Sequence, residues 1–415
     1  MGTALIVYPF LFLALFFESF ILVTLLSKPA RATRARKPAT NDDALPAVAV
    51  IVPCWNEGET LVATTESVLA LDYPALKLEV VLVDNASTDD TPRIMERYRE
   101  NPRVRLVHES KQGKHHAVNA GIAATSAEFI GCLDADSFVA PDALREAIVS
   151  FDDPRVAATT AAMSVHAPDT ILRHMQNAEY IFGIILRHAL ATVNGIHVTP
   201  GPFSLYRRSV VDALGGFQFG YQTEDMEMAL RLQRAGYRID SAPRARVYTK
   251  APATLPKLVK QRVRWTSGFL RNVLGEYRGL VGRRQYGALG IIVLPLGFLA
   301  IASGLLLTGL AVVRMWDMIS TAIAVRSGIP FSYAWVPPVS HFDWFYLPGT
   351  FFVGLGVATL IISVGMIIAG KRLSKTPGSL GLGIVSYAFL YGLVAPLWLA
   401  QSAFDVTFGK KRGWR

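Results

Sequence analysis

Residues 47–57 read AVAVIVPCWNE, and this stretch decides the fold. A short valine-rich run, here residues 47–53, that gives way to polar residues predicts a buried strand followed by a loop. Three further runs predict strands of the same kind: residues 79–84 (EVVLVD), 104–108 (VRLVH) and 128–134 (EFIGCLD). The chain therefore contains a set of short, buried strands.

The segments between the first three strands have the apolar spacing of helices, at residues 59–71 and 91–99. Strand and helix thus alternate along the chain, which predicts a mostly parallel sheet with helices on both faces. In such sheets ligands bind beyond the carboxyl ends of the strands. We therefore expect an α/β domain whose functional residues follow its strands.

Four other segments are apolar and long enough to cross a hydrocarbon layer of ~30 Å. They cover residues 4–26, 289–313, 345–369 and 380–403. The first is too long for the core of a signal peptide and has no basic stretch before it, which favours an uncleaved anchor over a cleaved signal. We expect an anchor at 1–30, an α/β domain at 45–250, an amphipathic interface helix at 251–284, about three membrane helices at 285–405 and a basic tail at 406–415.

The basic residues around these segments predict how the chain is oriented. Four of them lie between residues 31 and 37, directly after the first apolar segment, which by the positive-inside rule places the α/β domain on the cytoplasmic face of the cell membrane. Residues 316–344 contain little Lys or Arg, whereas the link at 370–379 is basic. Four crossings would leave the basic tail outside, so either the last segment does not cross or one span is miscounted.

The formal net charge of the chain is +10. Lys and Arg next to membrane segments bind anionic lipid headgroups, so we expect the bilayer, and no nucleic acid, as a partner. Cys54 and Cys132 both fall in the predicted cytoplasmic domain, where thiols stay reduced, so we expect no disulfide.

Polar residues follow three of the four predicted strands. Pro53, Asn56 and Glu57 follow the first strand, Asp84 ends the second and Asp134 ends the fourth. Because these strands are predicted to be parallel, the polar residues fall on one edge of the sheet. A carboxylate at the end of a buried strand is costly unless it is paired or binds a metal. The alternative for each residue is an Asx turn or a helix cap that ends the strand.

Asp134 and Asp136 stand two residues apart at the end of a strand. Carboxylates are hard oxygen ligands, suited to Mg²⁺ or Mn²⁺ carrying a diphosphate. The diphosphate is then also the leaving group, whose developing charge the cation neutralises. Lys114 is a second candidate cation for the same diphosphate. The sequence therefore predicts a divalent-metal and diphosphate site at this strand end.

Together with these strand-end acids, four more motifs complete a pattern that resembles glycosyltransferase family 2. The resemblance is to its membrane synthases of hyaluronan, poly-N-acetylglucosamine, chitin-like oligomers and cellulose, and it extends from about residue 48 to 272. The motifs are the lysine segment at 113–121, GPFSLYRR at 201–208, TED at 223–225 and QRVRW at 261–265. The last matches the family's Q-x-x-R-W signature and is the most specific of them.

The resemblance implies a GT-A nucleotide-binding fold and assigns the donor site by position. It places the nucleotide-sugar on the following residues: Pro53, Asn56, Glu57, Asp84, Lys114, Asp134 and Arg264. Asp84 would contact the uracil base, and Asp136 with Asp134 would hold Mg²⁺ or Mn²⁺. Asn85 stands where relatives often carry a second Asp, so the family role of that position does not transfer to it.

The resemblance also makes Asp225 the general base, with Glu224 as the next candidate. The chemistry needs such a group, because an acceptor hydroxyl must lose a proton as it attacks the anomeric carbon. The alternative is a helix start, in which Thr223 is the cap and the acids occupy the first turn. Both interpretations can hold together, since a helix start would position the carboxylate rigidly.

The acceptor side would include Gly201 and Pro202 of the GPFSLYRR loop and Trp265 of the signature, whose ring would stack on a sugar. The alternative for the signature is a surface role, because residues 258–274 are basic and amphipathic and such helices commonly lie on membranes. Residues 167–190 have similar spacing and are expected on the bilayer surface or along the acceptor path. His115 and His116 are interpreted as a solvated pair.

The resemblance implies an inverting, membrane-embedded enzyme that transfers a sugar, GlcNAc or a related hexose, from a UDP-sugar to a growing polysaccharide. Processive synthesis coupled to an export partner is the leading hypothesis. The alternative is single addition to a glycolipid of the ceramide or diacylglycerol type, followed by polyprenyl-phosphate transferases, which typically lack Q-x-x-R-W. A transporter or scaffold without enzymatic activity is the non-enzymatic alternative, and four spans with little polarity apart from Glu18 argue against it.

Overall fold

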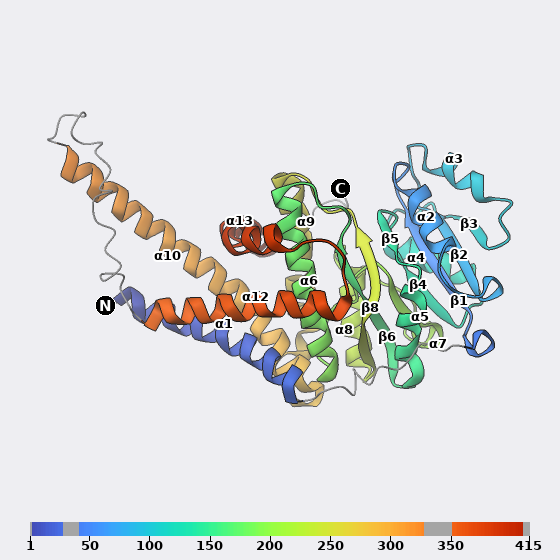
Figure 1. Cartoon of the computed structure of the whole chain (residues 1–415), viewed down its shortest axis with the longest axis horizontal. Coiled ribbons are helices and arrows are strands. Elements are labelled where there is room, and N and C mark those ends of the chain that lie inside the picture. Colours follow the sequence, from blue (N-terminus) through green and yellow to red (C-terminus); the bar gives the residue numbers. More distant parts are fainter. Residues whose placement is uncertain (1, 28–40, 328–350, 410–415) are drawn as a thin grey trace.

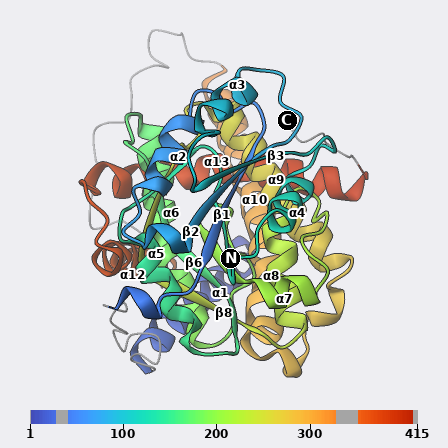
Figure 2. The same cartoon turned by 90° about the vertical axis from the view of Figure 1, so that its right-hand side faces the viewer.

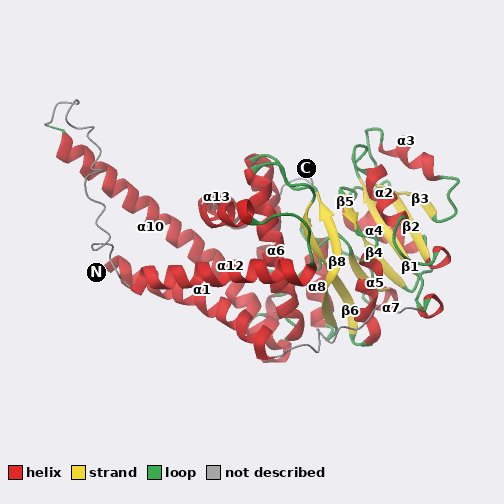
Figure 3. Cartoon of the chain, in the orientation of Figure 1, coloured by secondary structure: helices red, strands yellow, loops and turns green. Residues whose placement is uncertain are grey.

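The computed structural model describes residues 2–27, 41–327 and 351–409 (Figure 1). A single sheet dominates one end of the molecule and long helices form the other, as Figure 3 shows. The sheet has the strand order β3-β2-β1-β4-β7-β6-β8-β5. Its strands are β1 (Val48–Cys54), β2 (Leu78–Asp84), β3 (Val104–His108), β4 (Phe129–Cys132), β5 (Ser137–Val139), β6 (Val156–Val165), β7 (Ser204–Arg207) and β8 (Arg238–Thr249).

The first four strands are the predicted ones, and they form a parallel half-sheet. β1 pairs in parallel with both β2 and β4, and β2 pairs in parallel with β3. The strand-end residues that we expected on one edge follow these strands. The register opposes Cys54 to Asp84, which brings the ends of β1 and β2 to the same level.

The other half of the sheet is mixed. β7 runs antiparallel to β4 and to β6, β6 is parallel to β8, and β5 is antiparallel to β8. The sequence did not predict these four strands. β6 is rich in Ala and Thr, and β8 contains three Arg and a Pro, so neither has the apolar run that marks β1 and β2.

Helices cover both faces of the sheet, and alternate residues of β1 enter different cores. Val50 and Val52 pack with α2 (Leu61–Leu69), α3 (Thr91–Met95) and α5 (Ala143–Ile148). Ala49 and Ile51 pack with helices of the opposite face. Those helices are α4 (Lys114–Ala123), α7 (Arg208–Ala213) and α8 (Glu224–Arg234). The predicted α/β architecture is confirmed.

Two amphipathic helices, α6 (Ile171–Thr192) and α9 (Leu255–Leu274), pack against the long apolar helices. α6 packs against β6 and β8 on one side and against the apolar helices on the other. Much of its surface is therefore covered by protein, which limits the contact with lipid that was one of the two expectations for residues 167–190.

Four described helices are long and apolar enough to cross a membrane. They are α1 (Gly2–Ser27), α10 (Leu294–Arg326), α12 (Phe351–Ser374) and α13 (Gly381–Thr407). α10 extends well beyond the predicted residue 313, and the predicted residues 345–350 lie outside the described part of the chain. The basic residues between 31 and 37 and most of the basic tail also lie outside it.

Candidate active site

A cavity of about 1300 Å³ opens at the carboxyl ends of β1 and β4. Its lining carries seven Lys and Arg and five Asp and Glu, so the described wall is net positive, which attracts an anionic ligand. The charged residues of the lining are Glu57, Lys114, Asp134, Asp136, Arg173, Glu224, Lys250, Lys257, Lys260, Arg264, Arg271 and Asp405. The volume exceeds the ~300–1,000 Å³ of small-molecule sites, so the cavity can admit more than one ligand.

Lys114 joins two of the predicted acids at the base of this cavity. Its Nζ lies 2.5 Å from Asp134 Oδ1 and 3.1 Å from Glu224 Oε1. Burial alone would lower the pKa of Lys114, but Asp134, Glu224 and Asp225 together raise it well above its ordinary value. Lys114 is therefore a permanent cation held between the end of the fourth strand and the start of α8.

Gly201 lies directly behind this ion pair. A Cβ built on Gly201 would meet Lys114 Nζ at 2.5 Å and the two carboxylate oxygens of Asp134 at 2.7 and 2.8 Å. The backbone of the 201–208 motif therefore supports the Lys114–Asp134 pair at a distance that only glycine permits. Neither Gly201 nor Pro202 is part of the cavity wall, so their predicted contact with the acceptor stays a prediction.

Asp136 is the group most suited to a bound cation. Burial, then the charges of Asp134 and Glu57, raise the pKa of Asp136 to about 7. Ser137 Oγ is 3.1 Å from Asp136 Oδ1. The negative charges of Asp134 and Glu57 therefore act on Asp136, while Lys114 is the positive partner of Asp134.

Within the described residues, no cluster of three or more His, Cys, Asp and Glu forms a complete protein cage for a metal. Mg²⁺ at phosphate sites is usually held by one or two carboxylates plus phosphate oxygens and water. Asp134 and Asp136 fit such a partial set, and the crowding of negative charge at Asp136 favours a cation there.

Glu224 and Asp225 open α8, and they face different surroundings. Glu224 is buried, lines the cavity and pairs with Lys114. Asp225 is partly exposed but does not line the cavity, and its Oδ1 accepts a hydrogen bond from the Met226 amide (2.8 Å). Burial and the charge of Glu224 raise the pKa of Asp225 to about 6. The hydroxyl of Thr223 donates to the Gly220 carbonyl (2.6 Å) instead of capping the helix.

Asp84 and Asn85 follow β2 and are both buried. Asp84 Oδ2 lies 2.8 Å from His108 Nδ1. The Asn85 amide donates to the Glu109 and Lys111 carbonyls and accepts from the Gly113 amide (2.8 Å). Asn85 therefore ties the end of β2 to the loop before Lys114, which gives it a structural role.

The Q-x-x-R-W signature lies on α9. Gln261 and Arg264 line the cavity, as the donor assignment of Arg264 requires. The ring of Trp265 is not part of the cavity wall, and the guanidinium of Arg262 lies over it, 4.2 Å from the ring centroid. Arg262 in turn pairs with Glu179 of α6 (2.7 Å). The predicted stacking of Trp265 on an acceptor sugar therefore has no support in this geometry and stays a prediction.

Comparison with known proteins decides the family. Residues 46–268, more than half of the chain, match the family model described as glycosyltransferase like family 2. The chain belongs to this family. This match confirms the predicted family, and with it the prediction that the chain is an enzyme of the glycosyltransferase class.

Curated relatives of the chain include members of glycosyltransferase family 2 that make a polymer. The chain is 31% identical over 264 residues to the poly-beta-1,6-N-acetyl-D-glucosamine synthase of Staphylococcus aureus (strain COL), which covers 63% of each protein. It is 33% identical over 225 residues to the synthase of the same name from Staphylococcus epidermidis, covering 53% of this chain and 54% of the relative. The chain thus matches less than two thirds of the length of these relatives.

A solved structure resembles nearly the whole chain. It is a mannosyltransferase from Pyrobaculum calidifontis, in complex with GDP-mannose and Mn²⁺, with a TM-score of 0.57 and 21% identity. The similarity covers 96% of this chain and 99% of that one. At this identity the likeness concerns the fold alone, and it confirms the predicted combination of a nucleotide-sugar transferase fold with long helices.

The family motifs left out one part of the site, the loop between α7 and α8. Phe219, Tyr221 and Gln222 line the cavity from this loop, and Phe219 and Tyr221 are 61% and 42% exposed. His115 also lines the cavity and lies edge-on to Phe219, with 5.8 Å between ring centroids. The sequence signal for this surface was the pair of aromatic residues, Phe219 and Tyr221, just before the TED motif.

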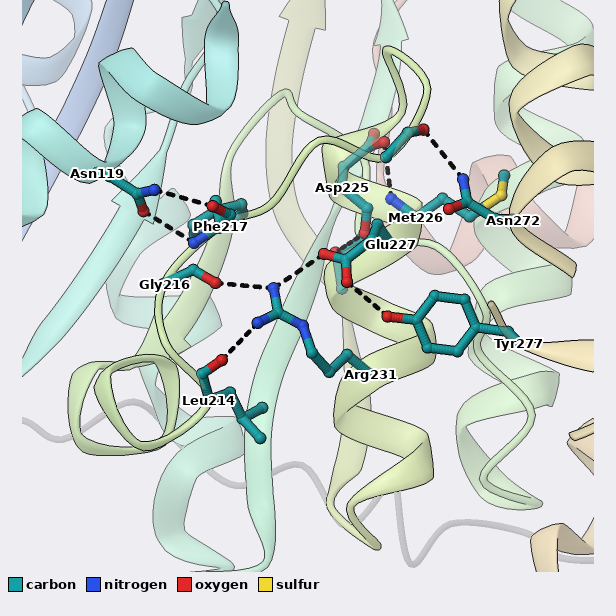
Figure 4. Close-up of polar contacts among 12 residues, drawn as sticks. Asn119, Leu214, Gly216, Phe217, Asp225, Met226, Glu227, Arg231, Asn272 and Tyr277 are labelled. Carbon is teal, nitrogen blue, oxygen red and sulfur yellow. Dashed lines mark hydrogen bonds and ion pairs between the residues drawn. The ribbon is translucent and has the colours of Figure 1, made fainter. Parts of the chain in front are cut away.

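Buried polar contacts anchor the loop at both ends (Figure 4). At its start, Arg231 donates to the carbonyls of Leu214 (2.5 Å) and Gly216 (2.7 Å) and pairs with Glu227 (2.9 Å). Glu227 also accepts from the Tyr277 hydroxyl at 2.5 Å.

Two asparagines complete this support. Asn119 of α4 exchanges two hydrogen bonds of 2.8 Å with the backbone of Phe217. Asn272 of α9 donates to the Gly220 carbonyl (3.0 Å) and lies 3.1 Å from the Thr223 hydroxyl oxygen. The loop is therefore held firmly although its aromatic side chains are exposed.

Proposed function

We propose that the chain is a membrane-embedded, inverting glycosyltransferase that transfers a sugar from a nucleoside-diphosphate sugar to a growing glycan. The observation that carries this proposal is Lys114, fixed between Asp134 and Glu224 at the base of a net-positive cavity. The pair brings a diphosphate-binding cation next to the acids that start α8. Donor and acceptor can therefore meet at one point.

The donor diphosphate would bind along Asp134, Asp136, Lys114 and Arg264. Lys114 and Arg264 supply positive charge to the phosphates. The base of the nucleotide would bind at the end of β2, where Asn85 lines the cavity and the buried Asp84 lies directly before it. Asp134 and Asp136 would hold a divalent cation, Mg²⁺ or Mn²⁺. When bound, that cation neutralises charge on the leaving diphosphate.

The acceptor hydroxyl needs a base, and Asp225 fits this role best. A general base works well when its pKa lies near the operating pH, and the pKa of Asp225 is about 6. Glu224 lies on the cavity wall, but its carboxylate is already engaged in the ion pair with Lys114 at 3.1 Å. Glu224 would instead hold Lys114 in place.

The acceptor glycan would rest on Phe219 and Tyr221. Sugar rings have an apolar face that packs on aromatic rings, and these two side chains expose theirs in the cavity, five and three residues before Glu224. We assign them the stacking role that the family resemblance implied for Trp265, because the Arg262 guanidinium lies over the Trp265 ring.

UDP-N-acetylglucosamine is the donor that the relatives favour, since those named above are poly-β-1,6-N-acetylglucosamine synthases. The α/β domain would lie on the cytoplasmic face of the cell membrane, where nucleotide-sugars are made. The product would be a polysaccharide, extended processively and delivered to an export partner.

The test uses full-length protein in detergent with radiolabelled UDP-N-acetylglucosamine, UDP-glucose or GDP-mannose, with Mn²⁺ or Mg²⁺. The product is sized beside a D225N variant. A matched control is D212N, since Asp212 is an exposed acid paired with Arg208 outside the cavity. We expect a labelled polymer from wild type and D212N, and at least a ~10²-fold slower reaction with D225N.

The other outcomes separate the alternatives. Label confined to extractable lipid would move single addition to a glycolipid into first place. Full activity in D225N with loss in an E224Q variant would transfer the role of base to Glu224. No transfer from any donor would overturn the proposed function.

A further inference from the structure

Both ends of α13 contact the pair of amphipathic helices α6 and α9. Near its start, a Cβ on Gly383 would be 2.9 Å from the His174 carbonyl oxygen of α6. Near its end, the Asp405 carbonyl accepts a hydrogen bond from Arg271 of α9 (2.9 Å), and Asp405 lines the active-site cavity. At ~1.5 Å per residue these two points are ~33 Å apart, which is the thickness of a hydrocarbon layer.

The middle of α13 also packs against α6 and α9. Trp398 is 3% exposed and packs with Met175 of α6 and with Leu258 and Val263 of α9. Ser402 lies 3.5 Å from the Val263 carbonyl. The opposite side of α9 lines the cavity with Lys257, Lys260, Gln261 and Arg264. Along its second half, α13 is therefore only one helix away from the site where a water-soluble nucleotide would bind.

The figures show the direction of α13. In Figure 1, α1 and α12 run along the long axis of the molecule, whereas α13 is seen nearly end-on beside α6 and α9. In Figure 2, which looks along that long axis, α13 extends across the view. α13 is thus roughly perpendicular to the two helices that we expect to cross the membrane.

The side of α13 that faces away from α6 and α9 is an apolar stripe. Its exposed large side chains recur every three to seven residues, at one face of the helix: Leu382, Val385, Phe389, Leu393, Leu397 and Phe404. Phe389 and Leu393 are 73% and 74% exposed. This stripe is continuous with the apolar α10, which α13 contacts. An exposed apolar surface of this size marks a contact with an apolar medium.

We propose that α13 does not cross the membrane but lies in its cytoplasmic interface, with this stripe in the lipid and its other side on α6 and α9. Helices of this kind bury their apolar side ~5–10 Å below the headgroups. The chain then has three spans, α1, α10 and α12. Three crossings put the basic link at 370–379 and the basic tail on the same side as the α/β domain, as the positive-inside rule requires.

Cysteine labelling of the full-length protein tests which side each end of α13 faces. The native Cys54 and Cys132 are buried, so they give a low background. A membrane-impermeant maleimide is applied to right-side-out and inverted vesicles that contain L76C, F408C or S320C variants. Leu76 is a fully exposed marker of the α/β domain, Phe408 follows α13, and Ser320 lies in the far part of exposed α10. We expect Leu76 and Phe408 positions to react from one side and the Ser320 position from the other.

Reaction of F408C from the same side as S320C would overturn the proposal, because α13 would then cross. A depth measurement excludes a helix that dips into the bilayer and returns. Spin labels at V385C, L393C and F404C are compared for collision with lipid-soluble oxygen and a water-soluble nickel complex. An in-plane helix gives three similar depths, whereas a central label deeper than both others by ~10 Å or more, near the middle of the bilayer, would contradict the placement.

Discussion

At the scale of single residues, Gly201 shows how little freedom the centre of the site allows. Replacing Gly201 with Ala would place a methyl carbon 2.5 Å from Lys114 Nζ and within 2.8 Å of both Asp134 oxygens. We expect G201A to displace the ion pair and to lower kcat by ~10²-fold, since a shift of ~1 Å near the chemistry has effects of this size. The melting temperature should change little. G279A is the matched control, because a Cβ there meets nothing within 4 Å. Unchanged kcat in G201A would show that the pair is not part of the reaction.

The proposed base makes a second prediction at this scale. Burial and Glu224 raise the pKa of Asp225 to about 6. A base must be deprotonated to accept the acceptor proton, so activity should be lost as pH falls through about 6 and should level off above it. The pH profile of kcat at saturating donor and metal measures this, with D212N as the control that keeps it. A wild-type profile that is flat between pH 5 and 7 would argue against Asp225.

A third prediction at this scale concerns Phe219 and Tyr221, the two exposed aromatic residues in the loop before α8. We expect Y221A to raise the KM for an N-acetylglucosamine oligomer about two- to tenfold, because one aromatic contact is worth ~0.5–1.5 kcal/mol. The KM for the donor should stay constant, and Y221F should behave as wild type because it keeps the ring. A rise in donor KM of the same size would instead place Tyr221 at the nucleotide.

At the scale of elements, the loop before α8 depends on a buried ion pair. Arg231 and Glu227 are 6% and 5% exposed, and Tyr277 completes the network. We expect R231M to lower the free energy of unfolding by ~3–5 kcal/mol, because it leaves the Glu227 carboxylate buried without its cation. R93M, which breaks an exposed pair with Asp90, should cost ~1 kcal/mol or less. Urea unfolding in detergent compares the two, and equal losses would mean that the network is not a special support.

Elements also show what the sequence can and cannot predict. β1 and β2 were predictable because each is an unbroken apolar run between turns. β6 and β8 were not, since they become strands by pairing with each other, with β7 in the case of β6, and with β5 in the case of β8. Within the site, the acids could be found from their places after strands. The contact of Lys114 with Glu224 could not, because 110 positions separate them and only the packing of α8 against the sheet brings them together.

At the scale of the whole molecule, small residues hold the apolar helices against the α/β domain. A Cβ on Gly370 of α12 would lie 2.5 Å from the Ile181 carbonyl oxygen of α6, so the two backbones nearly touch. We expect G370V to push α12 away from α6 and to lower both the melting temperature and the transfer rate, since α6 also carries Glu179, the partner of Arg262 on α9. G365V on the same helix is the matched control, because a Cβ there meets nothing within 4 Å. Thermal unfolding and transfer assays of both variants in the same lipid nanodiscs would measure the effect. If G370V matched G365V in both assays, the α12–α6 contact would carry no coupling, and the membrane helices would serve only to anchor the catalytic domain.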